Sequence, residues 1–142
     1  MTEPYASFRG ERFFLSNFYP APVTMYGKVY PSVEYAYVAA KTLDPKEREY
    51  IRNLSSPGVA KRYGRKLKVR EDWEQIKLEV METLVRRKFE NPALGAMLLA
   101  TGDEELVEVN YWYDTFWGTC NGKGENHLGK ILMKVRDRLR NL

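Results

Sequence analysis

Apolar residues recur with helical spacing over much of the chain. The longest such pattern covers residues 72–89 and predicts the longest helix. Its apolar stripe, at spacings of three and four, consists of Trp73, Ile76, Val80 and Leu84. A second amphipathic pattern covers residues 125–142 and predicts a terminal helix. Its inward positions are Leu128, Ile131, Leu132, Val135 and Leu139.

Start and stop signals predict four shorter helices. The first follows Ser32, its expected N-cap, in the segment YPSVEYAYVAAK at residues 30–41. The second has Asp44 as N-cap, Pro45 at its first position and Glu47 closing a capping box. The other two begin at Ser-Pro and Asn-Pro pairs further along the chain.

The Ser-Pro pair at 56–57 starts the third short helix, and Gly64 is expected to stop it. The Asn-Pro pair at 91–92 starts the fourth, which is expected to end near Gly102. These start and stop signals therefore divide the middle of the chain into helices and short connections.

Strand patterns are few and short. Residues 5–9, 12–14 and 105–110 are each expected to form a strand, and residues 23–30 a hairpin with the Tyr-Gly pair 26–27 near its tip. Helices thus dominate, with strands toward both ends. The fold class expected is α+β, mainly helical with a few short strands.

Length and composition narrow the possibilities. The 142 residues suit one compact domain, residues 1–142. His127 is the only histidine and Cys120 the only cysteine, which excludes an internal disulfide framework and leaves too few ligands of these types for a structural zinc site. The single cysteine favours a reducing, cytoplasmic setting. Neither a membrane-spanning segment nor a signal peptide is evident.

The segment at residues 30–41 places an acid and a base on one mostly apolar helix. Glu34 and Lys41 are seven residues apart, almost two turns, so they share a face with their Cα atoms ~10.5 Å apart. That gap is too long for an i,i+4 ion pair but suits two side chains that converge on a ligand. By spacing alone the simpler interpretation is favoured: Glu34 stabilises the helix start and Lys41 is solvated.

Two further segments carry candidate chemistry. In NYWYDTFWG, residues 110–118, aromatic residues crowd around Asp114, which indicates either a core plug with a turn or a stacking wall beside an acid. The basic segment KRYGRKLKVR, residues 61–70, is either a solvated face or a phosphate-binding edge in which Arg65 is the best candidate. A net charge of +4 also favours an anionic partner.

Taken together, the segments resemble one family. FFLSNFYPAPV, YPSVEYAYVAAK, GRKLKVREDWEQIKLEVM, KFENPALGAMLLATGDEELVEVN, YDTFWG and NHLGKILMKVR look like successive blocks of the NADAR family, which is also called the swarming-motility-protein-like or riboflavin-intermediate N-glycosidase family. The resemblance extends from about Phe8 to the last helix. Departures are Tyr35, where histidine is expected in many relatives, and Tyr113, where glycine or histidine is frequent. Both are expected to alter substrate fit.

The resemblance implies an enzyme that cleaves the N-glycosidic bond between ribose C1 and a base nitrogen, without a metal or organic cofactor. The substrate implied is a small ribosyl phosphate, such as a riboflavin-pathway intermediate, or an ADP-ribosyl compound, with ADP-ribosylated nucleic acid as a variant. The sequence leaves the oligomeric state open. The alternative is a non-catalytic module that binds ADP-ribose, a nucleotide or nucleic acid.

The resemblance also assigns residues. Glu34 and Asp114 are expected to be the catalytic carboxylates, with their two roles unassigned, and Lys41 either a cation that binds the sugar or phosphate or an amine that forms a Schiff base. Substrate binding is expected from an early loop, the basic segment, the aromatic loop and the start of the last helix. The residues that match blocks of the family are Ser16, Asn17, Phe18, Tyr19, Trp117 and Gly118. Arg65 and Asn126 are added from the basic segment and the helix start, as the residues expected to hold a phosphate.

Overall fold

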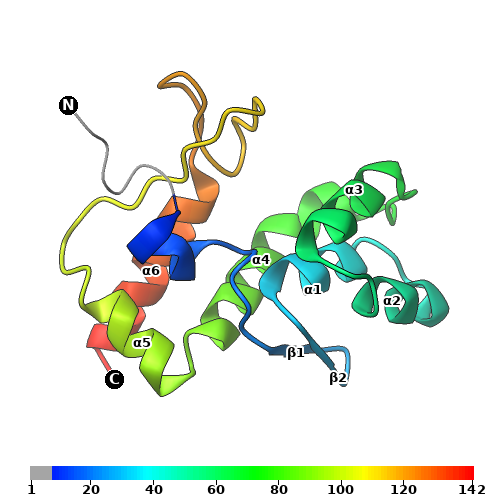
Figure 1. The fold of residues 1–142 in the computed structure, drawn as a ribbon, viewed down its shortest axis with the longest axis horizontal. Coiled ribbons are helices and arrows are strands. Elements are labelled where there is room, and N and C mark those ends of the chain that lie inside the picture. Colours follow the sequence, from blue (N-terminus) through cyan, green and yellow to red (C-terminus); the bar gives the residue numbers. More distant parts are fainter. Residues whose placement is uncertain (1–7) are drawn as a thin grey trace. The chain divides into compact units, whose positions relative to one another are not determined.

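Residues 8–142 are described by the structure, a computed structural model. Helices make up most of this part of the chain, and the only sheet within it is a two-stranded hairpin (Figure 1). The predicted α+β class, mainly helical with a few short strands, is therefore confirmed.

The chain divides into two units. The central unit is Asn17–Lys88, and the terminal unit combines Met1–Ser16 with Phe89–Leu142. Each unit is described by itself below. The prediction of a single domain over residues 1–142 stays a prediction.

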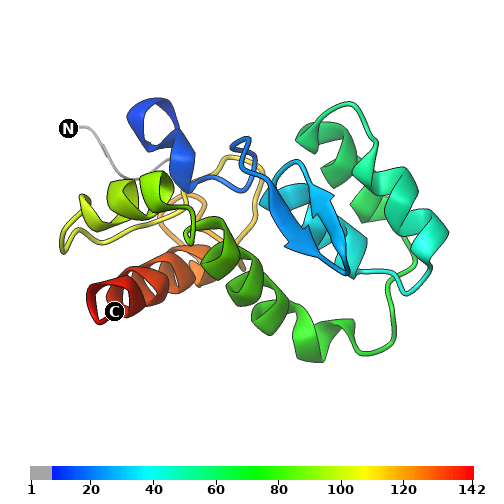
Figure 2. The same ribbon diagram turned by 90° about the horizontal axis from the view of Figure 1, so that it is seen from below.

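The central unit is a hairpin followed by four helices, of which the last three pack around the first. Its elements are β1 (Val23–Met25), β2 (Lys28–Tyr30), α1 (Val33–Ala40), α2 (Pro45–Arg52), α3 (Pro57–Lys66) and α4 (Trp73–Lys88). Helix α1 packs against the other three helices and against the hairpin (Figures 1 and 2). The hairpin turn is the one predicted, with Tyr26 and Gly27 both at positive φ, as the two central positions of a type I′ turn require.

Two sequence expectations in the central unit were wrong. Gly64 does not stop α3, which continues to Lys66, because the glycine instead lets α3 lie close to α1: a Cβ there would be 3.1 Å from a methyl group of Val38. Glu47 does not close a capping box, because it accepts a 2.7 Å hydrogen bond from the Tyr63 hydroxyl. The N-cap itself is as predicted, since the carboxylate of Asp44 accepts from the backbone N–H of the second helical residue.

The terminal unit is built on helices and irregular loops. Its elements are the 3-10 helix η1 (Gly10–Leu15), α5 (Pro92–Leu99) and α6 (His127–Arg140). Helix α5 packs on α6. The N-cap of α5 is Asn91, as predicted, and its side chain accepts from the N–H groups of Ala93 and Leu94.

The strands predicted outside the hairpin were wrong where the structure describes them. Residues 12–14 lie within η1. Of the predicted strand 5–9, residues 5–7 lie outside the described residues, and Phe8 and Arg9 are not in a strand. Residues 105–110 are in no named strand, because their one pairing is a single parallel bridge from Val109.

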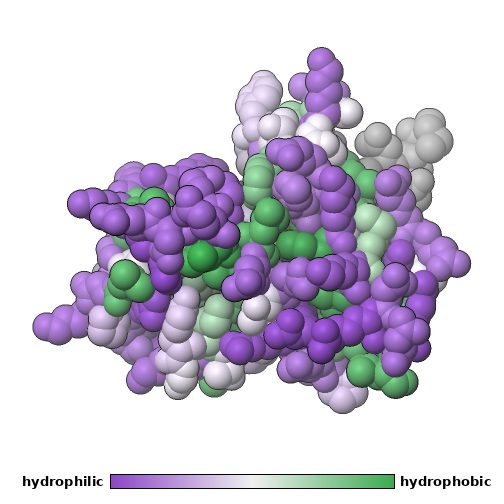
Figure 3. All heavy atoms as spheres, turned by 180° about the vertical axis from the view of Figure 1, so that it is seen from behind, coloured by the Kyte–Doolittle hydropathy of each residue, from purple (hydrophilic) through white to green (hydrophobic). Residues whose placement is uncertain are grey.

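Hydrophilic residues predominate on the face shown in Figure 3, with smaller apolar groups between them. Across residues 8–142, none of the helices has the length and apolar character that crossing a membrane would take.

Candidate functional site

Glu34 is the one residue of α1 that is not buried; the other seven belong to the core. Its backbone N–H donates a 3.1 Å hydrogen bond to the carbonyl of Asn17, which fixes the early loop against the first turn of the helix. Ser32 is at the predicted N-cap position, but its hydroxyl makes no capping hydrogen bond. The loop carbonyl therefore takes part in holding the helix start.

Lys41 is the C-cap of α1 and is partly buried. Burial lowers the pKa of its amine, while the negative charge of Glu34 acts in the opposite direction. The positive charges of Lys77, Arg65 and Lys61 also lower the pKa of Lys41. The acid and the base predicted to share a face therefore interact, and they do so among cations from α3 and α4.

Aromatic rings line this part of the central unit. The Lys41 Nζ atom lies 5.5 Å from the centroid of the Tyr37 ring, and that ring lies 5.1 Å from the ring of Trp73. The Nζ atom of Lys61 lies 5.8 Å from the centroid of Phe18, in the early loop. Phe18 is thereby placed near one of the cations that act on Lys41.

Tyr19, the second aromatic residue of the early loop, lies near a lysine that sequence reasoning missed. The centroid of its ring is 5.6 Å from the Nζ atom of Lys88, the last residue of α4. Lys88 is only 2% exposed, and burial lowers the pKa of its amine to about 7. Lys88 is four residues after Leu84 and so continues the predicted apolar stripe. That position was the signal in the sequence that this lysine is buried.

Tyr35 has a contact of its own. The ring is buried and its hydroxyl donates a 3.0 Å hydrogen bond to the carbonyl of Leu54, between α2 and α3. This departure from the family pattern is thus anchored in the packing of the helices, and its predicted effect on substrate fit stays a prediction.

Asp114 is held in the terminal unit by a network of side-chain and backbone hydrogen bonds. Its Oδ1 atom accepts from the backbone N–H groups of Phe116 at 3.1 Å and Trp117 at 2.9 Å. The fully buried Asn110 side chain donates to the Asp114 carbonyl at 2.8 Å and accepts from the N–H groups of Trp112 and Asp114. Asp114 thus forms the turn that the simpler interpretation proposed, and Asn110 is a residue that sequence reasoning missed.

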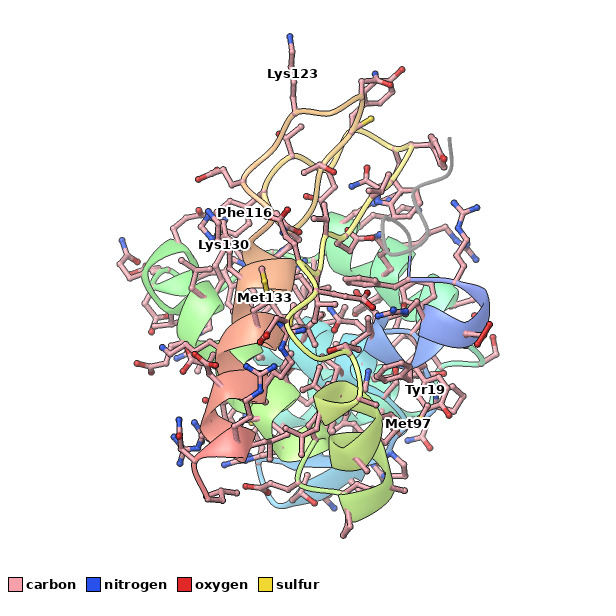
Figure 4. The ribbon with its side chains drawn as sticks, turned by 90° about the vertical axis from the view of Figure 1, so that its left-hand side faces the viewer. Tyr19, Met97, Phe116, Lys123, Lys130 and Met133 are labelled. Carbon is pink, nitrogen blue, oxygen red and sulfur yellow. The ribbon has the colours of Figure 1, made fainter. Side chains whose placement is uncertain are left out.

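The aromatic residues of this loop are divided between two environments. Tyr111, Trp112 and Tyr113 are exposed, whereas Phe116 and Trp117 are half-buried and their ring centroids lie 4.8 Å apart. Phe116 lies beside the start of α6, while Lys123 points outward from the tip of the loop (Figure 4). Phe116 and Trp117 are thus the two neighbouring half-buried rings of this loop, and the stacking wall stays a prediction.

Gly118 and Asn126 have structural contacts. A Cβ at position 118 would overlap the carbonyl oxygen of Glu108, so only glycine fits there. The side chain of Asn126 donates to the Leu106 carbonyl at 3.0 Å and accepts from the Glu108 N–H at 2.9 Å.

The backbone N–H groups at the start of α6 also have hydrogen-bond partners. The N–H groups of His127 and Leu128 donate to the carbonyls of Phe116 and Trp117. Asn126 and these N–H groups therefore have a structural role, and the prediction that this helix start holds a phosphate stays a prediction.

The predicted site residues therefore fall into two groups. The central unit contains Asn17, Phe18, Tyr19, Glu34, Lys41 and Arg65. The terminal unit contains Ser16, Asp114, Trp117, Gly118 and Asn126. The catalytic pairing of Glu34 with Asp114 joins the two groups and stays a prediction.

The fold and the residues carried by α1 and the aromatic loop define a protein family. The family model described as the NADAR domain matches residues 5–140, and the chain belongs to that family. This confirms the resemblance found in the sequence.

Individual relatives carry enzyme names. The N-glycosidase YbiA of Shigella boydii is 46% identical over 128 residues, which are 87% of this chain and 79% of the relative. The riboflavin biosynthesis protein VVA0006 of Vibrio vulnificus is 43% identical over 130 residues, 89% of this chain but 35% of that protein. The NMR structure of the Escherichia coli protein YbiA matches with a TM-score of 0.85 at 42% identity, covering 96% of this chain and 83% of that one.

Proposed function

We propose that this protein is an N-glycosidase that hydrolyses the bond between ribose C1 and a base nitrogen in a phosphorylated or ADP-linked ribosyl compound. Relatives with the name N-glycosidase, at 46% and 37% identity and across most of their own length, support the class of reaction. The observation that carries the proposal is the acid and partly buried base on α1, Glu34 and Lys41.

The reaction explains why an acid is needed on a rigid helix. As the C–N bond breaks, positive charge develops on C1 and negative charge on the leaving base. Of the two carboxylates Glu34 and Asp114, one stabilises the first charge or activates the attacking water, and the other serves the leaving base. Water supplies the hydroxyl that C1 gains and the proton that the base gains.

Lys41 supports a covalent variant of the same reaction. Burial and the neighbouring cations lower the pKa of its amine, so more of it is in the neutral form that attacks carbon. In this variant Nζ adds to C1 of the ring-opened sugar and the C1–N bond to the base breaks as the base gains a proton. Water then hydrolyses the imine and regenerates the amine.

A panel assay tests the proposal. Purified protein is incubated with phosphorylated riboflavin-pathway intermediates, ADP-ribosyl-guanine as nucleoside and in an oligonucleotide, and NAD, and the release of the free base is measured. Hydrolysis of at least one compound, abolished in Glu34→Gln, is expected. Tight binding of ADP-ribose without any base release would instead identify a binding module.

Reduction with borohydride separates the two roles of Lys41. A substrate-dependent mass increase at Lys41 is expected for the covalent variant. Hydrolysis during which borohydride traps no adduct would leave Lys41 as a cation that binds substrate.

A further inference from the structure

The C-terminal end of α1 needs hydrogen-bond donors from outside the helix. The helix ends at Ala40 with Lys41 as its C-cap, and the last carbonyls of any α-helix have no N–H partner one turn further on. Ala39 and Thr42, on either side of this end, are buried, so their carbonyls depend on donors from the protein. The last turn of α1 contains no basic side chain of its own.

Arg48 of α2 is such a donor. Its Nε–H is shared between the carbonyl of Thr42 at 2.8 Å and that of Ala39 at 3.3 Å, a three-centre bond of the kind common at helix ends. A cation is also favourable at the C-terminal end of a helix. The carbonyl of Lys41, between the two acceptors, accepts a 2.8 Å bond from the backbone N–H of Arg70. The backbone on both sides of Lys41 is therefore held by other elements.

Tyr26, in the hairpin turn, holds the Arg48 side chain. The Cζ atom of Arg48 lies 3.5 Å from the centroid of the Tyr26 ring, so the guanidinium is stacked on the ring. Tyr26 has φ of 53°, a conformation that bulky residues rarely adopt, and this type of turn favours asparagine or glycine there. A strained residue that places a ring on Arg48 indicates that the ring has a function.

Arg52, one turn later on α2, gives a matched contrast. It also donates to a backbone carbonyl, that of Val29 at 3.2 Å, and it makes two hydrogen bonds to Glu49 at 3.0 and 2.8 Å. Arg52 thus connects α2 to the hairpin, whereas Arg48 connects α2 to the end of α1. The two arginines have the same charge and the same kind of acceptor, but they support different segments.

We propose that Arg48, held by Tyr26, is a positioning residue that fixes Lys41 for its reaction with the ribosyl substrate. Lysine has a flexible four-carbon side chain, so the place of its amine depends on how firmly its backbone is held. Core packing holds the residues before Lys41, and Arg48 holds the residue after it. The inference takes the role of Lys41 from the proposed function, but the environment of the amine can be measured without any reaction.

Steady-state hydrolysis is the first test. Arg48→Met keeps an aliphatic side chain but removes the donor and the charge. It should lower kcat by about 10–10²-fold, because a small misplacement of a reacting group has effects of this size, and it should change KM by less than about threefold. The control is Arg52→Met, which removes the same charge and a bond to a carbonyl from the same helix and should keep kcat within about twofold.

Two substitutions of Tyr26 separate positioning from stability. Tyr26→Phe keeps the ring on Arg48 and should keep the wild-type kcat. Tyr26→Asn removes the ring but suits the positive φ of the turn, so kcat should fall about fivefold or more while the urea midpoint stays near that of the wild type. A purely structural role would not lower kcat without lowering stability. If Arg48→Met does not fold, this pair still decides the question.

Acetylation of Lys41 by an amine-reactive ester tests the placement without substrate. The ester reacts with the neutral amine, so the rate of modification at Lys41 across pH, measured by peptide mass spectrometry, follows its pKa. In Arg48→Met the midpoint should move toward the ordinary value of 10.5 by about half a pH unit or more, because a less firmly held amine gains contact with water. Arg52→Met should keep the wild-type midpoint.

Several outcomes would overturn the proposal. Equal losses of kcat in Arg48→Met and Arg52→Met would show only a general effect of weakening α2, and a raised KM at unchanged kcat would assign Arg48 to substrate binding. Identical acetylation profiles of the wild type and Arg48→Met would show that Arg48 does not place Lys41.

The two assays also separate this proposal from the proposed function. A wild-type protein without N-glycosidase activity would refute the reaction, whereas a shifted acetylation midpoint in Arg48→Met would still show that Arg48 places Lys41. Hydrolysis that Arg48→Met retains in full would refute the positioning role and leave the reaction standing.

Discussion

The two units hold their proposed catalytic carboxylates in different ways. Glu34 projects from α1, a helix whose other seven residues belong to the core of the central unit. Asp114 lies in an irregular loop of the terminal unit, and its own carboxylate accepts the hydrogen bonds that shape that loop. Apolar packing of seven residues supports the helix, whereas the carboxylate of Asp114 itself takes part in the hydrogen bonds of its loop.

This difference determines how substitutions should be interpreted. Removing the Glu34 side chain leaves the apolar packing of its helix in place, and it removes a charge that acts on Lys41. Removing the Asp114 side chain tests chemistry and loop structure together, because two backbone N–H groups lose their acceptor. Only a substitution that preserves the acceptor makes the two positions comparable.

The largest expected effect is on hydrolysis, in a matched pair of such substitutions. Glu34→Gln and Asp114→Asn should each lower kcat by ~10²–10⁴-fold, because each removes a charge or a proton donor and keeps the shape of the side chain. In Asp114→Asn the amide oxygen of the new side chain can still accept from the N–H groups of Phe116 and Trp117. Base release under single-turnover conditions measures the effect, and wild-type rates in both variants would rule out the proposed pair.

The next effect is on the stability of the loop. Asn110→Ala should lower the free energy of unfolding by about 2–3 kcal/mol, because the buried amide makes three hydrogen bonds to the backbone of the loop. Glu34→Ala, the matched deletion on α1, should cost less than about 1 kcal/mol. Urea denaturation measures both values. Equal losses would contradict the contrast between loop and helix.

Lys88 is a buried amine in the central unit, and it should make the free energy of unfolding depend on pH. Burial lowers its pKa to about 7 from an ordinary 10.5, so between these values the unfolded chain binds more protons than the folded one. The free energy of unfolding should therefore rise with pH across this window, by up to ~1.4 kcal/mol per pH unit. Below pH 7 and above 10.5 Lys88 contributes no slope.

Lys88→Met should remove this contribution. Urea denaturation at intervals from about pH 6 to about pH 10 gives the slopes, and the difference between wild type and variant isolates Lys88 from other titrating groups. Parallel pH profiles for the two proteins would show that Lys88 keeps its ordinary pKa in the folded state.

The smallest expected effect concerns backbone strain in the aromatic loop. Tyr113 has φ of 65°, a conformation that bulky side chains rarely adopt, and it is 78% exposed. Tyr113→Asn should raise the free energy of unfolding by about 0.5–1 kcal/mol, because asparagine tolerates this region. Tyr111→Asn, an exposed neighbour without positive φ, should bring no such gain in the same denaturation experiment. A gain in both would point to a general effect of replacing an exposed ring with a polar side chain.

The helices were predictable because their signals are local. Ser56, Asp44 and Asn91 precede proline and cap the next helix, and apolar spacing identified α4 and α6. The end of α3 was not predictable in this way, because Gly64 is explained by its contact with Val38 on another helix. Residues 105–110 show the same limit for strands, since alternation indicates a strand but only a partner forms one.

The candidate site was predictable where function needs an unusual residue in a regular element. Glu34 and Lys41 stand out on an apolar helix. Lys77, in contrast, looks in the sequence like an ordinary surface lysine. Its charge lowers the pKa of Lys41 only because α4 packs beside α1. Asn110 escaped notice for a similar reason: its importance lies in backbone groups that it satisfies after folding.

The composition of α1 has a consequence for how this protein would respond to random mutation. With seven of its eight residues in the core, almost any replacement along α1 should first reduce the amount of folded protein in a cell. Glu34 should be the exception in that helix, a position where many replacements leave abundance intact and abolish activity. A mutational scan that records abundance and activity separately would identify Glu34 without any assumption about chemistry.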